Sequence, residues 1–131
     1  MRAAIPALAK RRPRRRKEED DIQKSIVDFL ERVLPKALTY AIPNAARRFA
    51  GGRAGNAVPG LKKGMPDLHT ALDDGTGFYW EVKTRDGVLS AEQVDRQAEL
   101  RARGHRVATV TGIDDVRRAL QRHNIITREA A

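Results

Sequence analysis

Near the start of the chain, apolar residues recur at spacings of three and four positions, at Ile22, Ile26, Phe29 and Val33. This spacing is the period of one face of an α-helix, and the residues between are mostly polar. Pro35 ends the pattern, because a proline lacks the N–H of a helical hydrogen bond and its ring clashes with the preceding turn. The pattern predicts an amphipathic helix over about residues 20–34, with the acids of 18–21 at its start, where the helix dipole favours negative charge.

Short apolar runs later in the chain are typical of β-strands. Residues 37–42 predict an edge strand, while 67–72 and 78–83 predict an antiparallel hairpin joined by the turn 73–77. Residues 106–111 predict a further core strand. Because side chains alternate along a strand, Phe78, Trp80 and Val82 should face the core, and Glu81 and Lys83 should share the opposite face.

Two further helices follow from capping signals. Ser90 and Gln93 have the spacing of a capping box, so a helix should run from there to about Arg103, with Gly104 just past its end. Asp114 or Asp115 opens a last helix, after which a tail is expected. The order of helix, three strands, helix, strand and helix predicts an α/β domain with a small mixed sheet flanked by helices. The unit over 78–111 should be a right-handed parallel crossover.

Composition limits the class of protein. The chain has 131 residues, enough for one domain with a core. It has no cysteine, so a disulfide framework and a thiolate metal site are excluded, which fits a reducing compartment. No apolar run approaches the roughly 18 residues that a membrane span needs.

Positive charge is concentrated in two places. Eight of the 26 Lys and Arg residues lie in residues 1–17, which leaves 18 basic and 17 acidic residues in 18–131. We expect residues 1–17 to be a disordered basic arm that neutralises phosphates, and residues 18–131 to be the folded domain. Residues 32–66 form a second basic block without acids, much of it in a Gly- and Arg-rich loop. Both blocks indicate a polyanionic partner.

Two acids and a lysine are predicted to meet on one sheet face. Asp67 opens one strand of the hairpin, and Glu81 and Lys83 end the other. Carboxylates are suited to Mg²⁺, and a lysine beside them can orient and polarise an attacking water. Each part alone has an ordinary explanation, because Glu-x-Lys is common on exposed strands and Gly-x-Pro-Asp is common in turns. Together they indicate phosphodiester hydrolysis.

Further groups can complete such a site. Glu19 lies on the extension of the buried helical stripe and could add a ligand, although acids at a helix start are common for dipole reasons alone. The Val82 backbone carbonyl is a possible third ligand beside the strand acids, and Gln93 could hold the water or the lysine. His69 shares a strand face with Asp67 and could touch substrate, but a partly exposed surface histidine explains it as well.

These motifs, in this order, resemble the VRR-NUC nucleases, a branch of the PD-(D/E)xK superfamily. The similar segments are Glu19-x-x-Ile22-Gln23, Pro43-Asn44, Leu61 to Leu68 (LKKGMPDL), Glu81-Val82-Lys83 and Gly87-x-Leu89-Ser90-x-x-Gln93. They span about residues 18–120. The resemblance implies a restriction-endonuclease-like core in αβββαβ order. It also implies a catalytic set of Asp67, Glu81, Lys83 and Gln93, with Glu19 as a metal ligand beside the two strand acids; the neighbouring Glu18 is the alternative helix acid.

The resemblance further implies an endonuclease that uses Mg²⁺ or Mn²⁺ to cut DNA, with branched DNA as a preferred substrate in replication, repair or recombination. A phage or bacterial protein in the cytoplasm and a possible homodimer are also implied. Expected DNA-binding residues are Asn44, Arg47, Arg48, Arg53, Lys62 and Lys63. Two alternatives stay open: a nucleic-acid-binding protein of this fold without catalysis, and a structural protein whose acids are ordinary surface residues.

Overall fold

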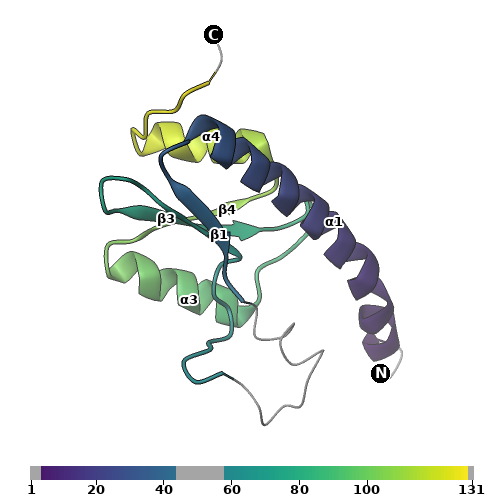
Figure 1. The fold of residues 1–131 in the computed structure, drawn as a ribbon. Coiled ribbons are helices and arrows are strands. Elements are labelled where there is room, and N and C mark those ends of the chain that lie inside the picture. The colour runs from purple at the N-terminus through teal and green to yellow at the C-terminus, as the bar shows by residue number, and fades with distance from the viewer. Residues whose placement is uncertain (1–3, 44–57, 130–131) are drawn as a thin grey trace.

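The computed structural model describes residues 4–43 and 58–129, with side chains from Arg14 onward. Figure 1 shows the elements in these ranges, which are α1 (Ala4–Val33), β1 (Leu38–Ala41), β2 (Leu68–Ala71), β3 (Gly77–Val82), α3 (Ala91–Ala102), β4 (Arg106–Val110) and α4 (Ile113–Arg122). Their order is the predicted one, and the α/β class is confirmed.

The four strands form one mixed sheet in the order β1-β2-β3-β4. β1 pairs with β2 and β2 with β3 in antiparallel directions, so the predicted hairpin is confirmed, with Ala71 opposite Gly77 beside its turn. β4 pairs with β3 in parallel, as the predicted crossover requires, with Val82 opposite Val110. The antiparallel pairing of β2 with β3 places the end of β3 beside the start of β2.

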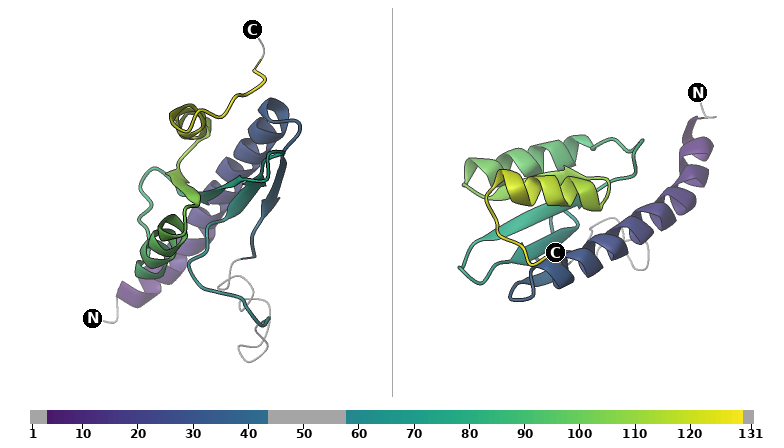
Figure 2. Two further views of the ribbon diagram at one scale, coloured as in Figure 1. Left: turned by 90° about the vertical axis from the view of Figure 1, so that its left-hand side faces the viewer. Right: turned by 90° about the horizontal axis from the view of Figure 1, so that it is seen from above.

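Helices cover both faces of the sheet (Figures 1 and 2). The core lies between the sheet and the pair α1 and α4, and includes Ile26, Phe29, Leu30, Leu68, Phe78, Trp80, Val82, Val116 and Leu120. The predicted inward side chains of β3 are all buried. The Trp80 indole stacks on Phe78 at 4.0 Å between ring centroids and donates its N–H to Thr70 Oγ1 at 2.9 Å. α3 packs on the opposite face, where Gln97 hydrogen-bonds to Thr109.

The first helix differs from the prediction at its start. α1 begins at Ala4, so residues 4–17, expected as a disordered arm, form the first half of one 30-residue helix. The segment is rich in Ala, Arg and Lys, which favour helices. Pro6 lies in the first turn, where its missing N–H has no helical partner to lose. Residue 17 is therefore not a boundary of secondary structure.

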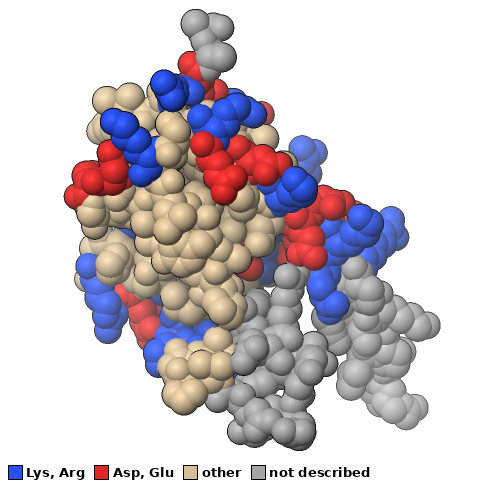
Figure 3. Space-filling model, in the orientation of Figure 1, with Lys and Arg blue, Asp and Glu red and all other residues tan. Residues whose placement is uncertain are grey.

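The N-terminal half of α1 projects beyond the sheet, as both views in Figure 2 show. Figure 3 shows basic and acidic side chains next to each other along the visible part of this helix, while the centre of the same face is uncharged. Within the described helices, including α1, no segment has the length and apolar character needed to cross a membrane.

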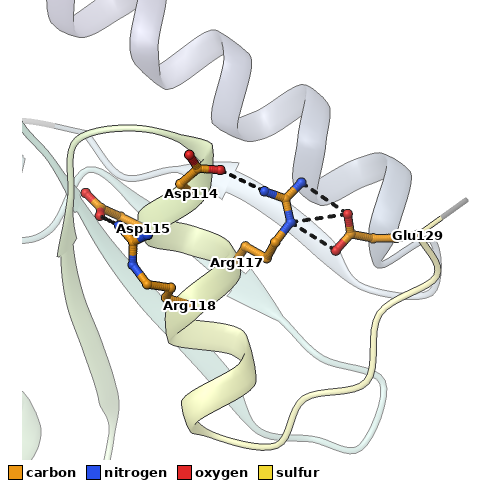
Figure 4. A network of polar contacts seen from close by, with 5 residues as sticks. All are labelled: Asp114, Asp115, Arg117, Arg118 and Glu129. Carbon is orange, nitrogen blue, oxygen red and sulfur yellow. Dashed lines mark hydrogen bonds and ion pairs between the residues drawn. The ribbon is translucent and has the colours of Figure 1, made fainter. Parts of the chain in front are cut away.

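The segment after α4, expected as a tail, is attached to both helices of the core layer. Arg117 on α4 donates hydrogen bonds to Glu129 and to Asp114 (Figure 4), and its guanidinium lies over the Phe29 ring. The backbone N–H of Arg128 donates to the carbonyl of Val33, the last residue of α1, at 2.7 Å. The C-terminal segment therefore links α4 to the end of α1.

Candidate active site

Asp67 lies where three strands meet. Its backbone N–H donates to the carbonyl of Trp80 at 2.9 Å, and its carbonyl accepts from Ile42 at 2.8 Å. Its carboxylate accepts a hydrogen bond from the backbone N–H of Val82, with Oδ2 at 2.7 Å. These contacts connect the residue to both neighbouring strands, so its side chain is held in one orientation beside the end of β3.

Glu81 is a buried carboxylic acid, with only 1% of its surface exposed. Oε2 accepts a hydrogen bond from Gln93 Nε2 at 3.0 Å. Oε1 is buried and has no hydrogen-bond partner in the described part of the chain. Leaving a buried carboxylate oxygen ionised and without a partner is costly, so this environment favours a proton, a hydrogen-bond donor or a cation at Oε1.

Burial raises the pKa of Glu81 to about 9. The negative charge of Asp67 adds to this increase, together with the hydrogen bond that the two carboxyl groups can form when one holds a proton. The charge of Glu19 raises the pKa further, while Lys83 lowers it. Like charges held this close cannot all ionise without compensation. The site therefore favours either a proton or a bound cation.

Lys83 continues the line of β3 and is partly buried. Its backbone N–H donates to the Val110 carbonyl at 3.0 Å, which extends the parallel pairing by one residue. Gly87 leaves room for the lysine stem, because a Cβ at Gly87 would come within 3.2 Å of Lys83 Cδ. The positive charge of Lys83 lowers the pKa of Glu81, so the ammonium group lies close enough to interact with this acid.

Gln93 has two functions in the structure. The predicted capping box is confirmed: Gln93 N–H donates to Ser90 Oγ at 3.1 Å, and the Ser90 N–H donates to Gln93 Oε1 at 2.8 Å. The remaining amide group, Nε2, donates to Glu81. A side chain expected to hold a water or the lysine thus contacts the buried acid directly.

Glu19 comes from the middle of α1 and is partly buried, whereas Glu18 is exposed. The negative charge of Glu19 reaches Glu81. Across the described residues, no three or more His, Asp or Glu side chains are arranged closely enough to hold a metal ion. Asp67 and Glu81 are a close pair, and Glu19 in its present position does not form a three-ligand cluster with them.

Other residues expected at the site are placed less centrally. Lys62 and Lys63 are exposed, and the Lys63 carbonyl accepts two hydrogen bonds from Arg96, which attaches this loop to α3. Asn44, Arg47, Arg48 and Arg53 lie outside the described residues. His69 Nδ1 is 2.9 Å from the Tyr40 hydroxyl, and its ring lies among Tyr40 and Tyr79.

One contact at this end of the sheet was not anticipated. Arg15, assigned from the sequence to the arm, donates from Nη1 to Thr84 Oγ1 at 2.7 Å. Thr84 directly follows Lys83 and is buried. Arg15 lies four residues before Glu19 on α1, so the two residues share a helix face.

A cavity of about 580 Å³ is lined by residues from the end of β1, the 58–65 loop and α3. Ile42, Met65 and Leu100 contribute apolar walls, and none of the three site acids lines it. The candidate site is therefore not part of this cavity.

The two acids on the strands offer donor atoms that suit a divalent cation. Asp67 and Glu81 provide hard oxygen donors, the type that Mg²⁺ and Mn²⁺ prefer. Among the described residues Glu81 Oε1 has no hydrogen-bond partner, and burial together with the acids around it raises the pKa of Glu81. A cation here would satisfy the buried oxygen and offset the repulsion between the carboxylates. The residues present therefore fit a metal ion.

Comparison with known proteins identifies the architecture. No family model matches the sequence. No curated protein matches it either. A solved structure described as a VRR_NUC domain aligns with a TM-score of 0.59 at 23% identity, over 81% of this chain and 96% of its own. Another, described as a VRR_NUC domain protein, aligns with a TM-score of 0.57 at 21% identity, over 79% and 84%. The chain has the fold of the VRR_NUC domain, which its motifs predicted.

Proposed function

We propose that the protein is a metal-dependent deoxyribonuclease that hydrolyses internal phosphodiester bonds of DNA, with Mg²⁺ or Mn²⁺ as its cofactor. Branched DNA is the proposed preferred substrate, which would place the enzyme in replication, repair or recombination of a phage or bacterium. A homodimer acting in the cytoplasm is part of the same proposal. The VRR_NUC fold supports this class of activity.

The observation that carries the proposal is the environment of Glu81. A buried acid whose oxygen has no partner among the described residues, with a second acid beside it, is costly for stability, and Lys83 offsets part of this cost. An ordinary surface pair has no such cost, which argues against a purely structural role for Asp67 and Glu81. Groups with strongly perturbed pKa values and a specific charged neighbour are typical of functional sites.

Each residue has a separate task in this scheme. Asp67 and Glu81 would hold the cation, with Glu19 from α1 and the Val82 carbonyl as further ligands. When bound, the cation would neutralise the scissile phosphate and make a water molecule more acidic. Lys83 would orient the attacking water and offset the charge that develops on the phosphate. Gln93 would keep the Glu81 carboxylate in position through the hydrogen bond from Nε2.

DNA would reach this site over basic residues. The exposed Lys62 and Lys63 lie shortly before Asp67, in a loop fastened to α3 through Arg96. The arginines of the preceding loop (Arg47, Arg48 and Arg53) and Asn44 are proposed to extend this surface. Phosphate contacts of this kind position the DNA without selecting a sequence.

Incubating the protein with plasmid, linear and four-way-junction DNA under a Mg²⁺ or Mn²⁺ titration tests the proposal. Cleavage should require metal, disappear in EDTA, and be lost in Asp67→Asn, Glu81→Gln and Lys83→Ala variants. Cleavage of the junction at lower enzyme concentration than linear duplex would support structure selectivity. DNA binding without cleavage under any metal would instead indicate a nucleic-acid-binding protein, and activity that persists in EDTA would overturn the mechanism.

A further inference from the structure

We propose that Arg15 is a substrate-binding residue of this site, which holds a DNA phosphate next to the one that is cleaved. This inference rests on the proposed nuclease function and adds a residue to it. It also separates Arg15 from the other basic residues before position 18, which were expected to contact phosphates without any fixed position.

The position of Arg15 is set from two sides. Arg15 and Glu19 are four residues apart on α1, so they share a helix face and are offset by about 6 Å along its axis. The guanidinium donates to Thr84 Oγ1 at 2.7 Å, and Thr84 directly follows Lys83. Arg15 is therefore fixed beside the end of β3, one helical turn from the acid of α1 whose charge reaches Glu81.

The guanidinium is poorly satisfied in this position. It carries five N–H donors, and its one hydrogen bond within the described part of the chain goes to Thr84. Nε is buried and has no hydrogen-bond partner there. No described carboxylate forms an ion pair with Arg15, whereas Arg117 pairs with both Asp114 and Glu129. A partly buried cation in this state is stabilised by an anion that can accept several hydrogen bonds.

A phosphate of the bound DNA strand meets these requirements. Its oxygens match the planar fork of a guanidinium, which binds phosphate through two parallel hydrogen bonds. A second metal ion does not fit, because arginine has no lone pair to offer. The offset of about one helical turn from Glu19 places the contact on a phosphate adjacent to the reacting one. Arg15 would thus fix the register of the strand.

The chain provides a matched control at the next position. Arg16 carries the same charge on the same helix, but its side chain is exposed. Arg15→Ala should weaken binding of a short DNA duplex in EDTA roughly tenfold to a hundredfold, because hydrogen bonds to charged groups are lost. Arg16→Ala should weaken it by at most about fivefold, as for an exposed charge. Fluorescence anisotropy at one fixed salt concentration measures both without any metal or cleavage.

Single neutral phosphates in the substrate identify the contact. A methylphosphonate is placed in turn at each position around the cleavage point, and each substrate is tested with wild type, Arg15→Ala and Arg16→Ala. If Arg15 holds one phosphate, the losses of DNA affinity caused by Arg15→Ala and by the methylphosphonate at that phosphate are not additive. The loss caused by Arg16→Ala adds to that of the methylphosphonate at every position. Arg15→Lys should keep part of the affinity, because the charge remains while the fork is lost.

The same measurements distinguish phosphate binding by Arg15 from a purely structural role. If Arg15 only fastened α1 to β3, Thr84→Val would weaken DNA binding as much as Arg15→Ala, and no phosphate position would show coupling. Either result would overturn the inference, as would equal effects of Arg15→Ala and Arg16→Ala. If the wild-type protein binds DNA but never cleaves it, the proposed nuclease function is wrong. The binding measurements with the methylphosphonate substrates still decide the role of Arg15.

Discussion

Gln93 and Glu81 are joined by a hydrogen bond of 3.0 Å from the amide Nε2 to the carboxylate Oε2. The same amide accepts through Oε1 from the backbone N–H of Ser90. The first turn of α3 is therefore capped by the side chain that orients the buried acid. Helix capping and site geometry share one residue, and substitutions can separate the two contributions.

Gln93→Ala should lose both contributions, and Ser90→Ala should lose only the cap. Ser90→Ala should be destabilised by about 1 kcal/mol, because the capping box is broken. Gln93→Ala should be destabilised more, because Glu81 Oε2 also loses its hydrogen-bond donor. Only Gln93→Ala should also lower the cleavage rate, by about tenfold to a hundredfold, as expected when a group that orients a metal ligand is removed. Urea unfolding and cleavage assays measure the two effects. Equal losses of activity in both variants would show that the Glu81 contact has no functional role.

Protonation of Glu81 should make the stability of the metal-free protein depend on pH. Its pKa is raised from an ordinary value of 4.5 to about 9 in the folded state, so between these values the folded protein holds a proton that the unfolded chain has lost. The free energy of unfolding should therefore fall as pH rises from 5 to 9.

Glu81→Gln, measured in EDTA by urea unfolding, should remove this decrease. Burial lowers the pKa of His69, which gives a contribution of opposite sign: its stabilisation is present above about pH 6.5 and is lost as pH falls. The difference between wild type and Glu81→Gln isolates the carboxyl group, because His69 is present in both. Parallel pH profiles for the two proteins would contradict the raised pKa.

Asp67→Asn should weaken metal binding without unfolding the strand junction. The amide oxygen can still accept the hydrogen bond from Val82, but the negative charge is lost. Titration calorimetry with Mn²⁺ should show affinity reduced at least about tenfold, and cleavage should disappear. Asp73→Asn, in the exposed hairpin turn, removes the same charge away from the site and should behave like wild type. Unchanged Mn²⁺ affinity in Asp67→Asn would remove this residue from the ligand set.

Gly64 and Gly60 are a second matched pair. Both have positive φ angles, +81° and +88°. A Cβ at Gly64 would clash with the Glu92 carbonyl oxygen, whereas a Cβ at Gly60 would have no described atom within 4 Å. Gly60→Ala should cost about 1–2 kcal/mol of backbone strain. Gly64→Ala should cost more and also reduce cleavage, because the shifted loop leads into Asp67. Urea unfolding measures which variant loses more stability. A larger loss of stability in Gly60→Ala than in Gly64→Ala would be inconsistent with the packing at Gly64.

Local features of the fold were predictable because they depend on neighbouring residues. The Ser90–Gln93 capping box, the turn between β2 and β3 and the alternation along β3 involve contacts within a few positions, and all are present. The proximity of Asp67 to Glu81 followed from the hairpin register. These interactions have short sequence separations, so spacing alone identifies them.

Other features depend on how distant segments pack. The contact of Arg15 with Thr84 joins residues 69 positions apart, and no periodicity in the basic segment shows that α1 extends back to it. Burial of Glu81 to 1% exposure depends on α3 covering that face, which residue spacing does not reveal. The link between Glu129 and Arg117 was missed because the last residues lack any periodic pattern.

The continuity of α1 makes Arg15 and Glu19 parts of one rigid body. The C-terminal half of the helix is fixed in the core through Ile26 and Phe29, while its N-terminal half projects from the domain. A strand held at Arg15 would restrict where the Glu19 carboxylate lies, and a cation held at Glu19 would restrict the guanidinium. DNA and metal would then bind cooperatively. Because such coupling is reciprocal, the factor by which DNA raises metal affinity must equal the factor by which metal raises DNA affinity.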